Sequence, residues 1–324
     1  MTDSGMPKVL VAGCGDVGTA LGLRLARRGG RVIGVRRHAA ALPAPIEAVS
    51  LDLTDPGDER LPAVDAVVVT LTADGRDVAA YERTHLGGLR GLRRALGEQN
   101  PRVVLVSSTG VLGGGDGERV TESTPPDPQR PTAHVLLAAE DLAAELFPDL
   151  VVVRPAGIYG PGRTSLVQRV RSGKPLNHRR VTNRIHRDDL VTVLATVLSS
   201  SEPPRLLHAV DHDAARLGEV AAHLAHRLGV PVPPDDSAPG EGPLGKTVDG
   251  ALVHAFVPDA QWRYPTFREG YDALLAEGPG TAGRPVHSGA PHRGAAAPSA
   301  GHAGEAPGPS GIDPWGRPST GGGA

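Results

Sequence analysis

Short runs of apolar residues recur along the chain, and most are apolar at every position rather than at alternate ones. They lie at residues 8–12, 31–35, 48–53, 65–71, 102–108 and 150–155. Continuous apolar runs of this length are typical of parallel strands that are buried on both faces of a sheet. The pattern therefore predicts a buried parallel sheet.

Helical spacing separates several of these runs. Four leucines recur at intervals of three or four positions between Leu86 and Leu96, and residues 136–147 form a second helical segment. Strands that alternate with helices indicate an α/β domain. We therefore predict the α/β class and a doubly wound parallel-sheet Rossmann fold.

The composition changes abruptly at Gly278. The segment from there to Ala324 consists largely of Gly, Ala and Pro, and Trp315 is the one aromatic residue in this segment. Such a segment buries too little apolar surface to offset the entropy of ordering it. We predict that residues 278–324 form a disordered Gly/Ala/Pro-rich tail.

A glycine-rich turn of the form G-x-G-x-x-G directly follows the first apolar run and opens a helix. Its residues are Gly13, Gly15, Asp16, Val17 and Gly18. In a β-α-β unit the first glycine makes the tight turn and the second lets backbone approach a pyrophosphate. The third lets helix and strand pack closely. The turn therefore predicts a bound dinucleotide.

Two arginines follow the second apolar run, where an acidic residue would accept hydrogen bonds from the ribose of NAD. They are Arg36 and Arg37. Guanidinium groups suit a 2′-phosphate by charge and by geometry. The sequence therefore favours NADP over NAD.

Charge and cysteine content exclude several classes of protein. The chain has 34 Lys+Arg against 36 Asp+Glu, so it lacks the basic excess of a nucleic-acid-binding protein. One cysteine, Cys14, excludes an intramolecular disulfide and fits a reducing compartment. No apolar run approaches the roughly 18–20 residues that span a bilayer, and residues 1–7 are polar. We therefore expect a cytoplasmic protein with neither a nucleic acid nor a membrane as partner.

Several motifs occur together and in a characteristic order. They are GCGDVG at 13–18, LDLTD at 51–55, VLVSSTGVLG at 104–113, VVRPAGIYGPGR at 152–163, and TNRIHRDDLV at 182–191, with YPTFREGY at 264–271. From residue 7 to about residue 277 the chain resembles the extended short-chain dehydrogenase/reductase family, the NAD-dependent epimerase/dehydratase group. The last two motifs are most similar to its atypical branch.

The resemblance implies roles for residues at the strand ends. Asp52 and Leu53 would flank the adenine, and the residues under the adenosine ribose would be Thr70, Leu71 and Thr72. Ser107 follows the fifth strand, and the residues near the nicotinamide would be Pro155 and Ile158.

The resemblance also implies a division into domains. Residues 7–155 and 188–229 would form the NAD(P)-binding Rossmann domain, and 156–187 with 230–277 a small C-terminal substrate-binding lid. The many arginines of 156–187 favour a small anionic substrate, although a merely solvated surface is an equal alternative. Pairing of helices between subunits is frequent in the family, so a homodimer is a further expectation.

The chain departs from the family at its catalytic pair. The positions of the usual Tyr and Lys are taken by Thr132 and Leu136. A threonine hydroxyl is too weak an acid and leucine carries no charge, so neither replaces the pair. The remaining candidates for proton transfer or hydrogen bonding to substrate are Ser108, Thr109, Tyr159 and His134.

Three functions follow from these residues. The first is an NAD(P)-dependent oxidoreductase that acts on a small carbonyl, alcohol or nucleotide-sugar-like substrate without the usual pair. The alternative is a catalytically silent NADP-binding sensor or scaffold. A nucleotide-sugar epimerase or dehydratase is disfavoured because those reactions use the missing pair. No metal is expected, since Asp188 and Asp189 resemble the polar start of a helix.

Overall fold

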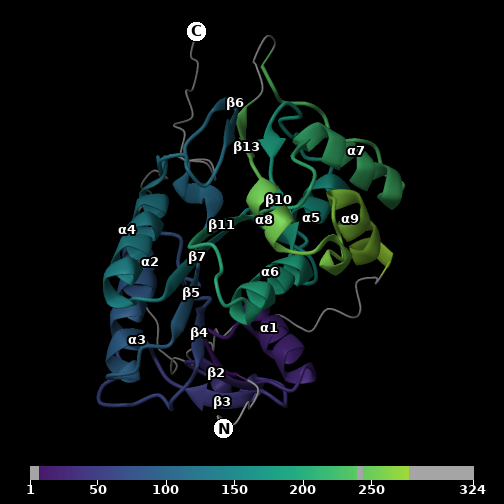
Figure 1. Ribbon diagram of the computed structural model, residues 1–324. Helices are drawn as coiled ribbons and strands as arrows, with labels where there is room; N and C mark the ends of the chain where they lie inside the picture. Colours follow the sequence, from purple (N-terminus) through teal and green to yellow (C-terminus); the bar gives the residue numbers. More distant parts are fainter. Residues whose placement is uncertain (1–6, 239–243, 277–324) are drawn as a thin grey trace, which may run out of the picture. The chain divides into compact units, whose positions relative to one another are not determined.

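The computed structural model describes residues 7–238 and 244–276, and a seven-stranded parallel sheet forms its centre (Figure 1). The strand order is β11-β7-β5-β4-β1-β2-β3. The strands are β1 (Lys8–Ala12), β2 (Arg31–Arg36), β3 (Glu47–Ser50), β4 (Ala66–Val69), β5 (Arg102–Val106), β7 (Leu150–Pro155) and β11 (Leu206–Ala209). The order reverses between β1 and β4, which is the switch point where such sheets bind ligands. The doubly wound parallel fold is confirmed.

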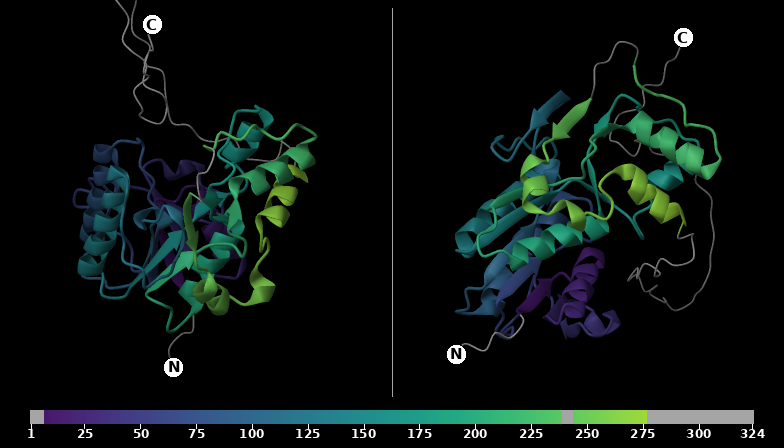
Figure 2. Two further views of the ribbon diagram at one scale, coloured as in Figure 1. Left: turned by 90° about the horizontal axis from the view of Figure 1, so that it is seen from above. Right: turned by 45° about the vertical axis from the view of Figure 1, so that its right-hand side comes forward.

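Helices cover both faces of the sheet (Figures 1 and 2). One face carries α1 (Asp16–Arg27) and α6 (Arg187–Ser199). The other carries α2 (Val78–Tyr81), α3 (Gly88–Leu96) and α4 (Pro131–Leu146), with a π-helical segment, η2 (Glu82–Gly87), between α2 and α3. Because strand side chains alternate between faces, two separate hydrophobic clusters form, one under each helix layer.

Two predicted elements differ in detail from the structure. The run at 48–53 was predicted as a buried strand, and this is wrong: β3 ends at Ser50 and is largely exposed. It lies at the sheet edge and pairs only with β2, so one side lacks a neighbouring strand. The helix predicted at 136–147 begins earlier, at Pro131, because proline is favoured in the first helical turn.

The remaining elements lie beside the carboxyl ends of the sheet strands. Three two-stranded pairs are β8 (Gly157–Tyr159) with β10 (Arg184–His186), β9 (Val181–Thr182) with β12 (Ala215–Arg216), and β6 (Asp116–Val120) with β13 (Gly245–Val248). The helices are α5 (Ser165–Arg171), α7 (Leu217–Leu228), α8 (Ala251–Phe256) and α9 (Phe267–Ala276). The 3-10 turns are η1 (Ala39–Ala41), η3 (Thr109–Val111) and η4 (Asp259–Gln261). Helices α5, α7 and α9 share a hydrophobic cluster of their own.

The packing bears on the predicted domain division, which stays a prediction. Helix α7 falls within 188–229, yet it packs with α5 and α9 rather than on the sheet. Helix α8 falls within 230–277, yet it packs on β11. The segments of the lid and of the Rossmann domain therefore interleave more than the sequence suggests. The predicted tail at 278–324 lies outside the described residues.

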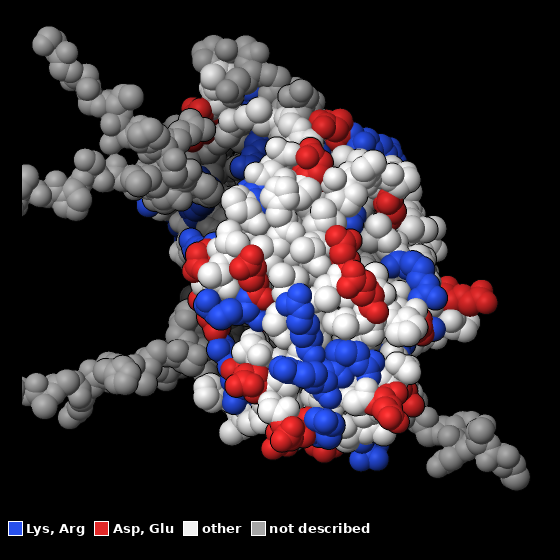
Figure 3. Space-filling view, turned by 90° about the vertical axis from the view of Figure 1, so that its left-hand side faces the viewer, with Lys and Arg blue, Asp and Glu red and all other residues white. Residues whose placement is uncertain are grey.

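The outer face of α2, α3 and α4 carries charges of both signs (Figure 3). Arg90 and Arg94 are exposed on α3, and Asp141 and Glu145 on α4. This is the solvent-facing side of amphipathic helices. The expected homodimer stays a prediction. None of the helices described in the structure is both long and apolar enough to cross a membrane.

Candidate functional site

The glycine-rich turn between β1 and α1 is shaped by contacts that only glycine permits. Gly13 has φ +77°, and a Cβ there would lie 2.9 Å from Leu71 Cα. At Gly18 a Cβ would lie 2.7 Å from a Val11 methyl carbon, so this glycine lets α1 pack against β1. The backbone N–H groups of Gly13 and Cys14 both donate to the Val35 carbonyl at 2.9 Å. The turn is therefore pinned to β2.

Cys14 lies inside this turn but belongs to the core. Its side chain is fully buried in a small cluster with Val11, Val32 and Ile46. Burial raises the pKa of the thiol, so the reactive thiolate is disfavoured. The residue fills space behind the turn.

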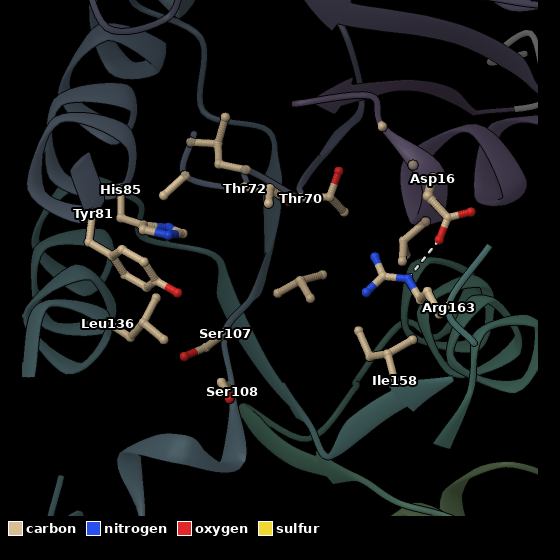
Figure 4. A pocket seen from close by; sticks show the side chains of 16 residues that line it. Asp16, Thr70, Thr72, Tyr81, His85, Ser107, Ser108, Leu136, Ile158 and Arg163 are labelled. Carbon is tan, nitrogen blue, oxygen red and sulfur yellow. Dashed lines mark hydrogen bonds and ion pairs between the residues drawn. The ribbon is translucent and has the colours of Figure 1, made fainter. Parts of the chain in front are cut away.

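A cavity of about 320 Å³ opens at the carboxyl ends of the central strands (Figure 4). Its lining comes from the glycine turn, from the ends of β4 and β5, from the helix layer of α2 and α4, and from β8 and the loop after it. The residues are Gly15, Asp16, Val17, Gly18, Thr70, Leu71, Thr72, Ala73, Tyr81, His85, Val106, Ser107, Ser108, Leu136, Ile158 and Arg163. Ligands of doubly wound sheets bind at this position.

The phosphate end of the cavity fits a dinucleotide. Gly15 lines it, and a Cβ there would meet no atom closer than 3.7 Å, so the backbone is open to a ligand. The start of α1 faces the cavity, where free N–H groups and the helix dipole favour an anion. The Thr70 hydroxyl donates to the Gly13 carbonyl at 3.0 Å and ties the turn to the end of β4.

One carboxylate lies in the phosphate turn, and two arginines neutralise it. Asp16 accepts from Arg163 Nε at 2.8 Å (Figure 4). It also accepts from Arg187 Nη1 at 3.0 Å. Asp188 also pairs with Arg187, so the two carboxylates and the two guanidinium groups carry no net charge. Arg163 itself lines the cavity and was expected only as one of several lid arginines.

The two arginines at the end of β2 have different surroundings. Arg37 forms a bidentate ion pair with Asp74 at 2.6 and 2.7 Å, and this pair lowers the pKa of Asp74. Arg36 is half-buried, and within the described chain its guanidinium has no acidic partner. Of the two guanidinium groups, only that of Arg36 has no ion pair with a carboxylate in the described chain.

The adenine candidates lie outside the cavity lining. Asp52 Oδ1 accepts from the backbone N–H and the hydroxyl of Thr54, at 2.9 and 2.8 Å. Leu53 is buried in the core beneath α3. The residues placed under the ribose, by contrast, all line the cavity: Thr70, Leu71 and Thr72.

The serines after β5 differ in what their hydroxyls can do. Ser107 Oγ donates to Glu140, whose carboxylate is held by Arg154 in a buried ion pair of 2.6 Å. Ser108 Oγ accepts from the backbone N–H of Gly110 at 3.0 Å, and a hydroxyl that accepts still has its own proton to donate. Ser108 can therefore hydrogen-bond to a ligand oxygen.

Several other candidates lie away from the cavity lining. Thr109 is buried in η3, and Pro155 is buried at the end of β7. His134 is exposed on α4. Tyr159 is 4% exposed, contacts the rings of His186 and Tyr271, and hydrogen-bonds to the Thr266 carbonyl at 3.5 Å. Burial raises the pKa of the Tyr159 phenol, which disfavours its ionised form. Ile158, its neighbour, does line the cavity.

Sequence analysis missed Tyr81 and His85, which line the cavity from α2 and η2. Their ring centroids are 5.3 Å apart. The leucines at helical spacing begin only at Leu86, so this pattern does not include the turn that holds Tyr81 and His85. Their spacing is a signal that the sequence does contain. A tyrosine and a histidine four positions apart lie on one face of a helix, and tyrosine is rare in this chain, which has four.

No metal centre is evident in the described chain. Within residues 7–238 and 244–276, no group of three or more His, Cys, Asp or Glu side chains could hold a metal ion. Asp188 and Asp189 lie in the first turn of α6. The Asp189 carboxylate accepts from the backbone N–H groups of Arg263 and Tyr264 at 2.8 and 2.9 Å, so it joins α6 to the segment before α9.

Known proteins share this architecture. A protein from Methylobacillus flagellatus assigned as an NAD-dependent epimerase/dehydratase is 31% identical, with 84% of this chain and 98% of that chain covered and a TM-score of 0.71. Human epimerase family protein SDR39U1 (isoform 2), solved with NADPH, is 21% identical, with coverages of 83% and 99% and a TM-score of 0.66. No match is found among curated protein sequences.

A third structure is UDP-glucuronic acid 4-epimerase from Bacillus cereus, solved with UDP-glucuronic acid and NAD. It is 18% identical, with coverages of 83% and 98% and a TM-score of 0.67, so it supports the fold alone. The model of the NAD dependent epimerase/dehydratase family matches residues 9–207. Because that match spans more than half of the chain and agrees with the glycine turn and the sheet, the chain belongs to the NAD dependent epimerase/dehydratase family.

Proposed function

We propose that this protein is an NAD(P)-dependent oxidoreductase that binds its dinucleotide along the cavity. The observation that carries the proposal is the cavity itself, which has the open Gly15 backbone at one end and Ser107 and Ser108 at the other. A pyrophosphate would lie at the start of α1, beside the guanidinium of Arg163. When bound, the nicotinamide ring supplies or accepts a hydride.

We propose NADP(H) rather than NAD(H) as the nucleotide. Arg36 is the last residue of β2, at the strand end where the adenosine ribose of a Rossmann cofactor lies, and it has no carboxylate partner in the described chain. Arg37 is engaged by Asp74, so it contributes less. A guanidinium forms charge-assisted hydrogen bonds with a 2′-phosphate, whereas a pair of ribose hydroxyls offers it only neutral acceptors.

The substrate that fits is a small carbonyl or alcohol with an anionic group. Residues 156–187 and 230–277 would bind it opposite the nicotinamide, with Ile158 as an apolar wall. Arginines are frequent in residues 156–187, which favours an anionic substrate. The UDP-glucuronic acid bound to the Bacillus cereus enzyme has this charge character. Ser108 would donate a hydrogen bond to the reacting oxygen.

A second function is an NADP-binding sensor or scaffold without turnover. The replacement of the family's pair by Thr132 and Leu136 favours it, because Leu136 presents an apolar side chain to the cavity. Both functions require dinucleotide binding, and only the first requires consumption of NADPH in the presence of a carbonyl compound.

The test is fluorescence titration of the full chain with NADPH and with NADH. We expect tighter binding of NADPH, and a loss of about tenfold in its affinity in Arg36→Ala, close to 1.4 kcal/mol. Arg31→Ala is the matched control, because Arg31 is exposed at the other end of the same strand. Equal affinities for both nucleotides would overturn the NADP assignment, and binding of neither would overturn the function.

Turnover then separates the two functions. NADPH absorbance is followed with a panel of aldehydes, ketones and nucleotide sugars. Consumption that depends on one of these compounds supports the oxidoreductase. Binding of NADPH without consumption across the panel supports the sensor.

A further inference from the structure

The wall of the cavity formed by α4 lacks a proton carrier. Leu136 is the one α4 residue in the lining, and Thr132 lies outside it. His134, two positions further along the helix, is exposed. A reaction that moves a hydride to or from a carbonyl carbon also needs a proton at the oxygen. The described residues of α4 do not supply one.

The neighbouring helix supplies two candidate groups to the same wall. Helix α2 and the π-helical η2 pack against α4, and Tyr81 and His85 reach the cavity from them. In Figure 4 the Tyr81 hydroxyl points into the cavity on the side of Leu136 and Ser107, with the His85 ring beside it. The two ring planes are inclined by 46° at a centroid separation of 5.3 Å.

Both groups are available for a ligand. Among the described residues, neither the Tyr81 hydroxyl nor the His85 ring nitrogens have a hydrogen-bond partner, and both side chains are only partly buried. The hydroxyls of Tyr159 and Ser107, by contrast, are engaged by protein oxygens. Polar groups that lie unpaired in a ligand cavity are the ones that orient a ligand.

The local backbone explains how two residues of a short helix face one cavity. Helix α2 ends at Tyr81, and the chain continues through η2 before α3 begins at Gly88. A π-helical segment inserted into an α-helix is uncommon and is frequently found at functional sites. Gly88 allows the following turn to pack against Leu71, since a Cβ there would lie 2.7 Å from a Leu71 methyl carbon. The segment is thus fixed against the end of β4.

His85 is a neutral imidazole at physiological pH. Burial lowers its pKa to about 4, so one ring nitrogen donates and the other accepts. His85 contacts Tyr81 through the two rings rather than through a hydrogen bond, so its effect on Tyr81 is one of position.

We propose that Tyr81 is the proton donor and acceptor for the substrate oxygen, with His85 as the group that positions it through the contact between their rings. This proposal rests on the proposed oxidoreductase function. In reduction, the carbonyl carbon receives a hydride, with its electron pair, from reduced nicotinamide dinucleotide. The C=O π electrons move to oxygen, which takes the proton of the Tyr81 hydroxyl. The phenolate regains a proton from water. Oxidation of an alcohol runs these steps in reverse.

The test uses tyrosine labelled with ¹³C at Cζ in the full-length protein. The chain has four tyrosines, so four signals are expected, and Tyr81→Phe identifies the one from Tyr81. We expect saturation with NADP⁺ to move the Tyr81 signal, because the cationic nicotinamide approaches the phenol. The signals of Tyr159 and Tyr271, which lie in the cluster of α5, α7 and α9, stay in place.

Substitution of the histidine tests the pairing. His85→Ala should move the Tyr81 signal before cofactor is added, whereas His134→Ala, on exposed α4 surface, should leave it unchanged. Tyr81→Phe should keep NADPH affinity within about threefold of the wild type. The outcomes separate the two proposals. NADPH binding with an unmoved Tyr81 signal overturns the role of Tyr81 and leaves the cofactor site intact. Absence of binding to the wild type overturns both.

Discussion

Two tyrosine–histidine pairs in this protein have nearly the same ring separation and very different surroundings. Tyr81 and His85 are 5.3 Å apart, and Tyr159 and His186 are 5.2 Å apart. Burial lowers the pKa of both histidines to about 4. The first pair lines the cavity, whereas the second lies in neighbouring strands β8 and β10, away from the cavity lining.

The partners of each pair account for the difference. His186 Nδ1 accepts from the backbone N–H of Asp188 and so caps α6, while Tyr159 packs against Gly270 and Tyr271. The hydrogen bonds of this pair are therefore made to the protein itself. The presence of a tyrosine and a histidine does not by itself identify a catalytic group; what decides is whether their polar atoms are left for a ligand.

The largest expected difference is in the free energy of unfolding. Tyr159→Ala should destabilise the protein by about 3–5 kcal/mol, because a buried aromatic side chain leaves a cavity in a packed cluster. Tyr81→Ala should cost about 1 kcal/mol, because its ring is only partly buried. Urea unfolding measures both. Equal losses would contradict the contrast between the two pairs.

Gly270 tests how tightly the Tyr159 pair is packed. A Cβ at this position would lie 1.9 Å from the Tyr159 hydroxyl oxygen. We expect Gly270→Ala to destabilise the protein by about 1–3 kcal/mol in urea unfolding. Combination with Tyr159→Phe, which removes that oxygen, should restore part of the loss. Gly115→Ala is the control, since a Cβ there meets nothing within 4 Å; a similar loss in the control would refute the packing argument.

The buried cluster near Tyr159 should also make stability depend on pH. Burial raises the pKa of Asp211 to about 8, against the partial opposing effect of Arg184. An unfolded aspartate titrates near pH 3.9. Between about pH 4 and pH 8 the folded protein therefore binds more protons than the unfolded one, and this contribution to stability falls as pH rises.

Asp211→Asn should remove this slope, which is at most about 1.4 kcal/mol per pH unit. Urea unfolding at several pH values between 4 and 8 measures it. Asp58→Asn, at an exposed position, is the matched control. An unchanged slope in Asp211→Asn would show that the carboxyl is ionised throughout this range.

The smallest expected difference separates the two histidines. His186→Ala should cost about 1 kcal/mol, because the N-terminus of α6 loses its side-chain cap. His85→Ala should change stability by only about 0.5 kcal/mol. Thermal unfolding compares them at one pH above 6.5, where both imidazoles are neutral in the folded protein. A larger loss from His85→Ala would mean that His85 also has a structural role.

Much of the fold and more than half of the residues that line the cavity could be predicted from sequence. The apolar runs at 8–12, 31–35, 102–108 and 150–155 mark strands, because burial on both faces demands apolar side chains throughout. The burial of β3 could not be predicted in this way, because an apolar run does not show whether a strand lies at the edge or in the middle of a sheet. Thr70 and Ser108 line the cavity as expected, because strand ends are set by local sequence.

The sequence by itself determined the parallel sheet, the glycine turn and its position at a helix start, because each depends on residues close together in the chain. Tertiary structure decided which tyrosine faces the cavity. Tyr81 lines the same cavity as Leu136 and Ser107 because α2 packs against α4. Tyr159 lies away from that cavity because β10 and α9 cover it. Local periodicity does not contain those long-range contacts, since they arise from packing between elements far apart in the sequence.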